Sequence, residues 1–320
     1  MRLAARHARR FGCSATRSAR LGDGRVLSWR PWATQIEETH GAGMPAAAGA
    51  VALAALAAAA TATTASFAFS VSSTDEDAAS SAAASTASPF AYPQLTAGIA
   101  QRQKAERALR DYSEQVKVMF HQVRMSCKSE AEYRVEMARL KAKVMARHTE
   151  ITFGEGINPH AREAYLNQFG CSRWTDQVLG RISEIQRPVV EIGAGAGQWQ
   201  RALAARGVDI VAYDNVPSHR SSLPGHSGKV LLGGVEKISS HPDRILLLCY
   251  PDPSAMAHEC LKLYEGDTLL YVGEGRGGVN ANAAFFDALE QDWDCQVVEE
   301  MDPFPQCFER FYILTRRHPR

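Results

Sequence analysis

A glycine-rich turn at Gly193 to Gly197 constrains the fold of this chain more than any other feature of its sequence. Glycine lets the backbone turn tightly and approach a ligand without a Cβ in the way. The turn follows a short apolar stretch, Val189 to Ile192. It precedes a helical segment at 198–206 and a second apolar stretch at 208–213, which ends in Asp214. This order of strand, glycine turn, helix, strand and acid predicts a βαβ unit that binds a nucleotide.

The spacing of the glycines separates two classes of nucleotide. A dinucleotide fingerprint reads G-x-G-x-x-G/A. The two positions where its third small residue could fall are occupied by Gln198 and Gln200. The spacing therefore argues against a dinucleotide oxidoreductase. The turn reads E-x-G-x-G-x-G instead, with Glu191 inside the first strand.

With Glu191, Gly193, Gly195, Gly197 and Asp214 in these places, the chain resembles the class I (Rossmann-like) S-adenosylmethionine-dependent methyltransferases. The resemblance implies a methyltransferase, a transferase whose cofactor is S-adenosyl-L-methionine. It also implies that the glycine turn lies along the methionine part, that Glu191 holds the amino end, and that Asp214 binds the ribose. The cofactor-binding residues expected on this basis are Glu191, Gly193, Ala194, Gly195, Gly197, Gln198, Asp214, Asn215, Cys249 and Tyr250.

The remaining segments follow the order of that fold. Strands are expected at 230–238 (in part), 244–250, 268–272, 295–301 and 308–315, with helices at 254–264 and 282–292. We predict an α/β fold with a doubly wound, seven-stranded, mostly parallel sheet and an antiparallel last strand, in a domain at 151–320. An α-helical arm and a disordered, targeting N-terminus are expected before it. Many members of the resembled family have an Asp near the adenine, at the turn after the third strand. Here Gly233 and Gly234 occupy that turn, and Glu236 is the nearest acid.

The fourth predicted strand leads into Cys249-Tyr250-Pro251-Asp252-Pro253 at the ligand-binding edge of the sheet. This sequence is similar to the N/D-P-P-Y/F tetrapeptide of amine-directed nucleic-acid methyltransferases, but it lacks the leading amide or acid and the paired prolines. We therefore carry over no substrate specificity. A hydroxyl or a protonated amine needs a base before it accepts a methyl group. The catalytic residues are unknown, with Asp252, Tyr250 and Glu274 as candidates. Structural roles are equally open: a turn-forming Asp, a Tyr at the edge of the core and a salt-bridged Glu.

The N-terminal hundred residues differ in composition from the rest. Residues 1–44 hold eight Arg and almost no acid, as an organellar targeting presequence does, although an unstructured basic tail has the same composition. We expect a mitochondrial location, in the matrix or at the inner membrane, with a plastid as the alternative. Within 45–98, the Ala-rich run 45–71 could anchor the chain in a membrane or serve as a linker. The rest reads as disordered linker, and none of 1–98 is assigned to the catalytic fold.

A helical arm is predicted over 99–150, broken near Met125, with Ser129 and Glu132 forming a capping box for the second helix. It either binds RNA or a protein partner, or it is a solvated face packed on the catalytic domain. In the segment that follows, Tyr165 and Trp174 either line the cofactor pocket or belong to the core.

Charge and cysteine content argue against strong non-specific nucleic-acid binding and against a metal site. Formal net charge is +1, and the Arg-rich first 44 residues leave the remainder mildly acidic, which argues against strong non-specific nucleic-acid binding. The seven Cys include no C-x-x-C, and the His residues have no metal-ligand spacing, so no metal site is predicted. The methyl acceptor is unknown, with a small molecule or protein favoured over RNA. The alternative function is a catalytically inactive, methyltransferase-like structural or assembly subunit of a mitochondrial complex.

Overall fold

The computed structural model describes residues 88–215 and 228–318. The chain divides into two units, Met1–Ala59 and Ala60–Arg320, and every described residue belongs to the second. The predicted presequence and the apolar run 45–71 lie outside the described residues. Within 88–215 and 228–318, no helix is long and apolar enough to cross a membrane.

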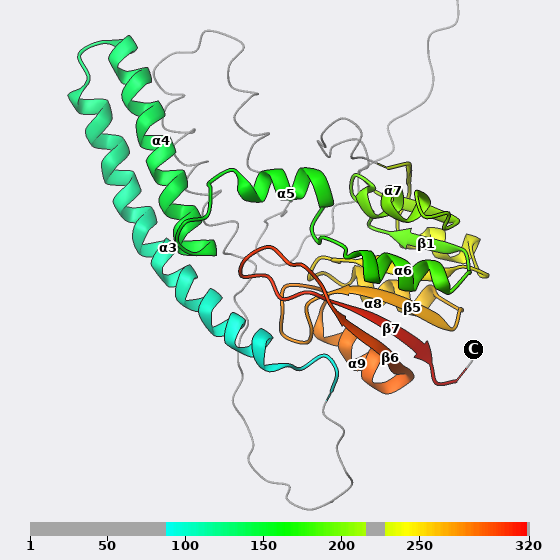
Figure 1. Cartoon of the computed structure of the whole chain (residues 1–320). Coiled ribbons are helices and arrows are strands. Elements are labelled where there is room, and N and C mark those ends of the chain that lie inside the picture. The colour runs from blue at the N-terminus through cyan, green and yellow to red at the C-terminus, as the bar shows by residue number, and fades with distance from the viewer. Residues whose placement is uncertain (1–87, 216–227, 319–320) are drawn as a thin grey trace, which may run out of the picture. The chain divides into compact units, whose positions relative to one another are not determined.

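One seven-stranded sheet forms the centre of the domain, in the order β3-β2-β1-β4-β5-β7-β6. Its strands are β1 (Val189–Ile192), β2 (Ile210–Asp214), β3 (Val230–Leu232), β4 (Ile245–Cys249), β5 (Thr268–Gly273), β6 (Trp293–Glu300) and β7 (Arg310–Arg316). All neighbouring pairs from β3 to β5 are parallel, and β7 runs antiparallel to both β5 and β6 (Figure 1). The order reverses direction between β1 and β4, which places a ligand-binding crevice at the carboxyl ends of these strands. This topology confirms the predicted fold class.

Helices cover both faces of the sheet because the central strands are apolar on both sides. The helices of the domain are α5 (Ala161–Phe169), α6 (Asp176–Glu184), α7 (Gln198–Ala204), α8 (Met256–Leu263) and α9 (Ala283–Asp292), with a 3₁₀ turn at Val235–Ser240. Val189 and Leu247 pack on the side of α6 and α7, whereas Val190 and Leu248 pack on the side of α8 and α9. The helix after the glycine turn ends at Ala204, two residues earlier than predicted.

The predicted helical arm is a pair of helices that pack side by side, α3 (Pro93–Ser126) and α4 (Glu130–Phe153) (Figure 1). The break falls where it was predicted, and the Ser129 hydroxyl accepts a hydrogen bond from the Glu132 N–H at 3.2 Å. The Glu132 carboxylate accepts from the Lys128 N–H at 2.8 Å, one residue before the position that a capping box predicts.

The structure corrects the boundary of the catalytic fold, which begins before residue 99. Phe90 is 1% exposed and its ring packs against Phe286 and Tyr312 in the core. The Phe90 carbonyl accepts a hydrogen bond from the Arg276 N–H at 2.9 Å, and the Tyr92 hydroxyl donates to the Phe308 carbonyl. Composition missed this segment because its few aromatic residues directly follow a long Ser- and Ala-rich stretch, whose low hydrophobicity dominates any sequence window.

Candidate functional site

The glycine turn adopts the conformation that its sequence requires. Gly193, Gly195 and Gly197 all have left-handed backbones, with φ of 80°, 60° and 75°. A side chain would meet different neighbours at Gly193 and at Gly197. A Cβ on Gly193 would lie 3.3 Å from the Met256 methyl group, whereas a Cβ on Gly197 would lie 2.6 Å from Val230. Gly193 therefore faces the side of the sheet where β4 leads into α8, and Gly197 lets the chain before β3 cross the turn.

Glu191 is an acid buried at the heart of this unit. It is 1% exposed, and its Oε2 atom is buried without a hydrogen-bond partner among the described residues. Burial, with a smaller contribution from the nearby Asp214 carboxylate, raises the pKa of Glu191 to about 8. An unpartnered buried carboxyl costs free energy that a bound donor would recover. Glu191 is thus positioned to accept a hydrogen bond from a ligand.

Asp214, at the end of β2, is 4% exposed. Its Oδ2 atom accepts a hydrogen bond from the Gly195 N–H at 2.8 Å, so its carboxylate ties the end of β2 to the glycine turn. Asn215 follows it and lines a pocket. Asp214, for which the resemblance implies a ribose contact, and Asn215, a predicted cofactor contact, therefore lie together at the carboxyl end of β2.

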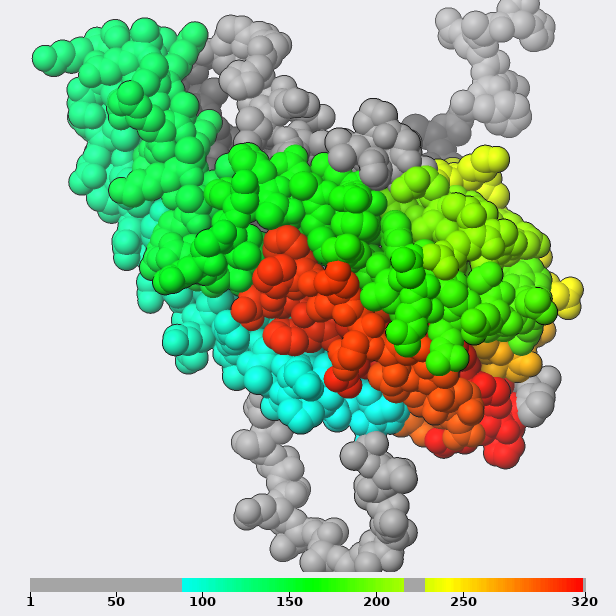
Figure 2. All heavy atoms as spheres, in the orientation of Figure 1, coloured from blue at the N-terminus to red at the C-terminus, as the bar shows by residue number. Residues whose placement is uncertain are grey.

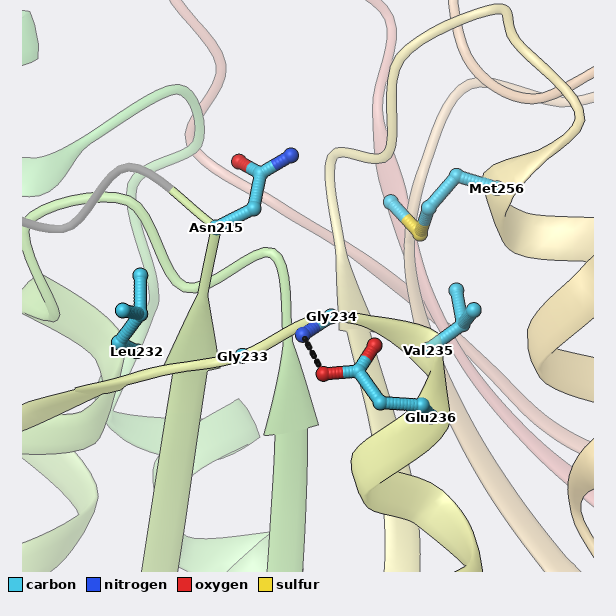
Figure 3. A pocket seen from close by; sticks show the side chains of 7 residues that line it. All are labelled: Asn215, Leu232, Gly233, Gly234, Val235, Glu236 and Met256. Carbon is cyan, nitrogen blue, oxygen red and sulfur yellow. Dashed lines mark hydrogen bonds between the residues drawn. The ribbon is translucent and has the colours of Figure 1, made fainter. Parts of the chain in front are cut away.

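This pocket has a volume of about 470 Å³ and lies at the turn after β3. Figure 3 shows its lining, formed by Asn215, Leu232, Gly233, Gly234, Val235, Glu236 and Met256. Glu236 turns back on its own loop, where its carboxylate accepts from the Gly234 N–H at 3.0 Å, and this bond lowers the pKa of Glu236. The walls are mostly apolar or glycine backbone, which suits a flat ring with a few polar edges.

The loop after β4 holds two of the three catalytic candidates. Asp252 is exposed, and its carboxylate accepts from the Ser254 N–H at 3.0 Å, as a turn-forming Asp does. Tyr250 has a left-handed backbone with φ of 52°, which is rare for a residue with a bulky side chain. Burial of its hydroxyl raises the pKa of Tyr250 well above the usual range.

The third candidate, Glu274, is completely buried and bonded to three other parts of the domain. Its carboxylate accepts from the Arg102 guanidinium at 2.8 Å, from the Val279 N–H at 3.0 Å and from the Phe308 N–H at 3.0 Å. These bonds join the helical arm, the loop after β5 and the loop before β7. Glu274 thus has the structural, salt-bridged role that was the alternative to a catalytic role.

Other residues predicted to contact the cofactor lie in different parts of the domain. Gln198 donates to the Leu166 carbonyl at 3.3 Å and so packs α7 against α5. Cys249 interacts electrostatically with Glu191 beside the glycine turn. The rings of Tyr165 and Trp174 both pack at steep angles against Phe169, with ring centroids 5.4 Å apart in each pair, and Trp174 also packs edge-to-face on Trp199. These two aromatic residues are packing residues of the helical layer.

The sequence analysis did not predict a second set of buried polar side chains, which surrounds Glu309. Glu309 is 1% exposed, and both of its carboxylate oxygens are buried without a hydrogen-bond partner in the described parts of the chain. Burial raises the pKa of Glu309 to about 7. The Arg162 Nη1 atom is also buried without a hydrogen-bond partner, and the nearby Ser172 hydroxyl lowers the pKa of Glu309, a smaller effect than that of burial. One signal was available: Glu309 precedes Phe311 by two residues, and such a position shares the buried face of a strand.

Within 88–215 and 228–318, no group of three or more His, Cys, Asp or Glu residues is placed to hold a metal ion. No family model matches the chain, and no curated protein matches it.

Several solved structures resemble this one weakly. Magnesium protoporphyrin IX methyltransferase from Synechocystis PCC 6803, with bound SAM, is 13% identical, with a TM-score of 0.33 over 44% of this chain and 77% of that chain. A 1,6-didemethyltoxoflavin-N1-methyltransferase from Burkholderia thailandensis, with bound S-adenosylhomocysteine, is 12% identical, with a TM-score of 0.34 over 56% and 90%. An rRNA methylase from Streptococcus thermophilus is 16% identical, with a TM-score of 0.29 over 44% and 95%. These similarities are slight, so the chain's own residues have to identify the ligand. In its sheet topology, the domain has the class I, Rossmann-like fold of SAM-dependent methyltransferases.

Proposed function

We propose that this protein is an S-adenosylmethionine-dependent methyltransferase that binds its cofactor across the carboxyl ends of β1 to β4. One observation carries the proposal: the buried, unpartnered carboxyl of Glu191 directly precedes a turn of three left-handed glycines. A ligand that brings an ammonium group to this point would pair with the carboxylate and remove the cost of its burial. The methionine part of S-adenosylmethionine carries such a group.

The rest of the site fits the remaining parts of the cofactor. The pocket of about 470 Å³ has the size and the apolar walls that an adenine ring needs. Along the chain, Asp214 and Asn215 follow the glycine turn and precede the other residues that line this pocket, and they would bind the ribose. The bare backbone at Gly193 allows close approach of the methionine part. When bound, the sulfonium supplies an activated methyl group, and the protein contributes mainly by aligning the acceptor with it.

Calorimetric titration of the full-length protein with S-adenosylmethionine tests this proposal. We expect saturable binding by the unaltered protein. Glu191→Gln keeps the shape of the side chain but removes its charge, and we expect it to weaken the affinity about tenfold or more, or roughly 1.4 kcal/mol. We expect Asp214→Ala to weaken the affinity severely.

Glu265→Gln is a matched control, because Glu265 is exposed and lies between α8 and the start of β5, at the opposite end of the strands from the turn. It should bind like the unaltered protein. Absence of binding by the unaltered protein would contradict the enzyme proposal and favour the catalytically inactive assembly subunit. Equal affinity of Asp214→Ala would contradict the ribose assignment alone.

We also propose that the protein acts in mitochondria, with a plastid as the alternative. The support is the Arg-rich, acid-poor composition of residues 1–44. Fusion of these residues to a fluorescent reporter tests this proposal. Import into the organelle is the expected result, and a diffuse cytosolic signal would contradict it.

A further inference from the structure

None of the cofactor contacts proposed above involves Glu309, Ser172 or Arg162. Glu309 lies in the connection between β6 and β7, and Figure 2 shows this connection, in orange and red, flanked by α3 in cyan and by the green helices. Contacts hold it there: the Phe304 ring packs on Phe153 and Tyr165 at 5.0 and 5.3 Å, and the Arg102 guanidinium lies over the Phe308 ring. The loop that presents Glu309 is therefore fixed on both sides.

Arg162, from α5, is the cationic partner that faces this group. Its guanidinium lies over the Tyr165 ring at 5.1 Å and over the Phe304 ring at 5.0 Å, which fixes its plane. Arg162 and Glu309 interact electrostatically, yet no hydrogen bond joins them, and the Arg162 Nη1 atom is buried without a partner. The buried atoms of these two side chains would gain hydrogen bonds from a molecule that bridges them.

The Glu309 group lies beside the proposed cofactor site. Cys249, at the end of β4, interacts electrostatically with Glu191 and also with Glu309, so it lies near both buried acids. Tyr250 follows Cys249 and interacts with Glu309 and Arg162. The left-handed backbone of Tyr250 directs this side chain, and such strain persists where the surrounding structure enforces it.

We propose that Glu309, Arg162 and Tyr250 form the acceptor side of the active site, where the Glu309 carboxylate takes the proton that a small N–H or O–H methyl acceptor loses. This inference rests on the proposed function. The acceptor donates its N–H or O–H to Glu309 and presents a carbonyl or carboxylate oxygen to Arg162. Because Glu309 is buried and Arg162 and Tyr250 are half-buried, the acceptor is a small molecule, not a nucleic acid or a protein surface.

Atoms and charges balance in this transfer. The acceptor nitrogen or oxygen forms a bond to the methyl carbon, the carbon–sulfur bond breaks, and its electron pair stays on sulfur. The acceptor proton passes to Glu309, which later releases it to solvent. A base that titrates near neutral pH is well matched to this role. The titratable and charged groups that face Glu309 are Glu274, Arg162, Tyr165, Tyr250, Cys249 and Cys307.

The test combines labelling with cofactor binding in the full-length protein. The protein is incubated with methyl-labelled S-adenosylmethionine and the low-molecular-mass fraction of an extract from the source cells, and label in small molecules is measured. We expect Glu309→Gln to lower labelling about 100-fold or more, the usual range for loss of a general base. Glu309→Asp should restore part of it. Calorimetry should show unchanged cofactor affinity in both variants, and Glu265→Gln, at an exposed position, is again the control.

The rate of labelling should rise with pH through about 7 in the unaltered protein, where the Glu309 carboxyl ionises. The residual activity of Glu309→Gln should not show this rise. If Glu309 had a merely structural role, the pH dependence would be the same in the variant. Full labelling by Glu309→Gln overturns the inference, as does an unaltered protein that binds the cofactor but labels no small molecule. Absence of cofactor binding by the unaltered protein is a different result, because it contradicts the proposed function itself.

A second measurement needs no cofactor or acceptor. Because burial favours the neutral form of Glu309, its charge destabilises the fold as pH rises from about 4.5 to about 7. Glu309→Gln should therefore have a higher Tm than the unaltered protein above neutral pH and an equal Tm in acid. A lower Tm of Glu309→Gln above neutral pH would show that the carboxylate already has partners, and it would overturn the inference.

Discussion

The Arg102 guanidinium lies 2.8 Å from the Glu274 carboxylate and joins α3 of the helical arm to the loop after β5. The two residues are 172 positions apart in sequence. The Glu274 side chain is fully buried, and that of Arg102 is 18% exposed. This pair makes the arm part of the α/β domain, since the same carboxylate also holds the loop before β7 through the Phe308 N–H.

Loss of this ion pair should destabilise the protein. Arg102→Met leaves a buried carboxylate without its cation, so we expect the free energy of unfolding to fall by about 3–5 kcal/mol. Urea denaturation measures it. The control is Arg134→Met, which removes an exposed ion pair with Glu130 on α4 and should cost about 0.5 kcal/mol or less. A small effect of Arg102→Met would show that the arm is not anchored through Glu274.

The corrected start of the fold gives a second prediction. Phe90→Ala removes a ring that is 1% exposed and packed on Phe286 and Tyr312, and should cost about 3–5 kcal/mol. Val118→Ala, at a side chain 56% exposed on α3, should change stability by less than about 0.5 kcal/mol. Equal stability of the two variants in thermal unfolding would place Phe90 outside the core.

Gly197 in the glycine turn and Gly207 after α7 provide a matched pair of substitutions. Gly197 and Gly207 both have left-handed backbones, so an Ala at either position costs about 1 kcal/mol or slightly more. A Cβ at Gly197 would also meet Val230 at 2.6 Å, whereas a Cβ at Gly207 meets nothing within 4 Å. Gly197→Ala should therefore destabilise more than Gly207→Ala, by roughly 1–3 kcal/mol. Similar midpoints in urea would mean that the chain before β3 does not cross the turn as described.

Ionisation of Glu191 should make stability depend on pH. Its pKa rises from 4.5 to about 8 in the fold, so the unfolded state releases the proton first as pH increases. Stability should therefore fall between pH of about 4.5 and 8, by a few kcal/mol at most. Glu191→Gln should remove its part of this dependence and be more stable than the unaltered protein at alkaline pH. Saturating S-adenosylmethionine should also reduce the dependence, because a bound ammonium group stabilises the charged form. Parallel pH profiles of the free unaltered protein and Glu191→Gln would contradict the raised pKa.

Local features of the sequence determined most of the fold. Strand and helix periodicity located all seven strands, and the spacing of Gly193, Gly195 and Gly197 distinguished this turn from a dinucleotide fingerprint. The Ser129 cap and the break between α3 and α4 were also predictable. These features are decided by residues within a few positions of one another, which is why a sequence window reveals them.

Only the tertiary structure decided which acids face each other and which are already bonded. Glu274 and Glu309 look alike in sequence, yet one is saturated by Arg102 and two backbone N–H groups, and the other has no partner for either oxygen. Residue type and spacing carry little information on this difference, because Arg102 of α3 is 172 residues from Glu274 and the Phe308 N–H comes from the loop before β7. The sequence alone thus determined the βαβ unit and the cofactor class that it predicts, while the three-dimensional packing of α3, α5 and the loop before β7 decided which buried carboxyls are hydrogen-bonded and which are not.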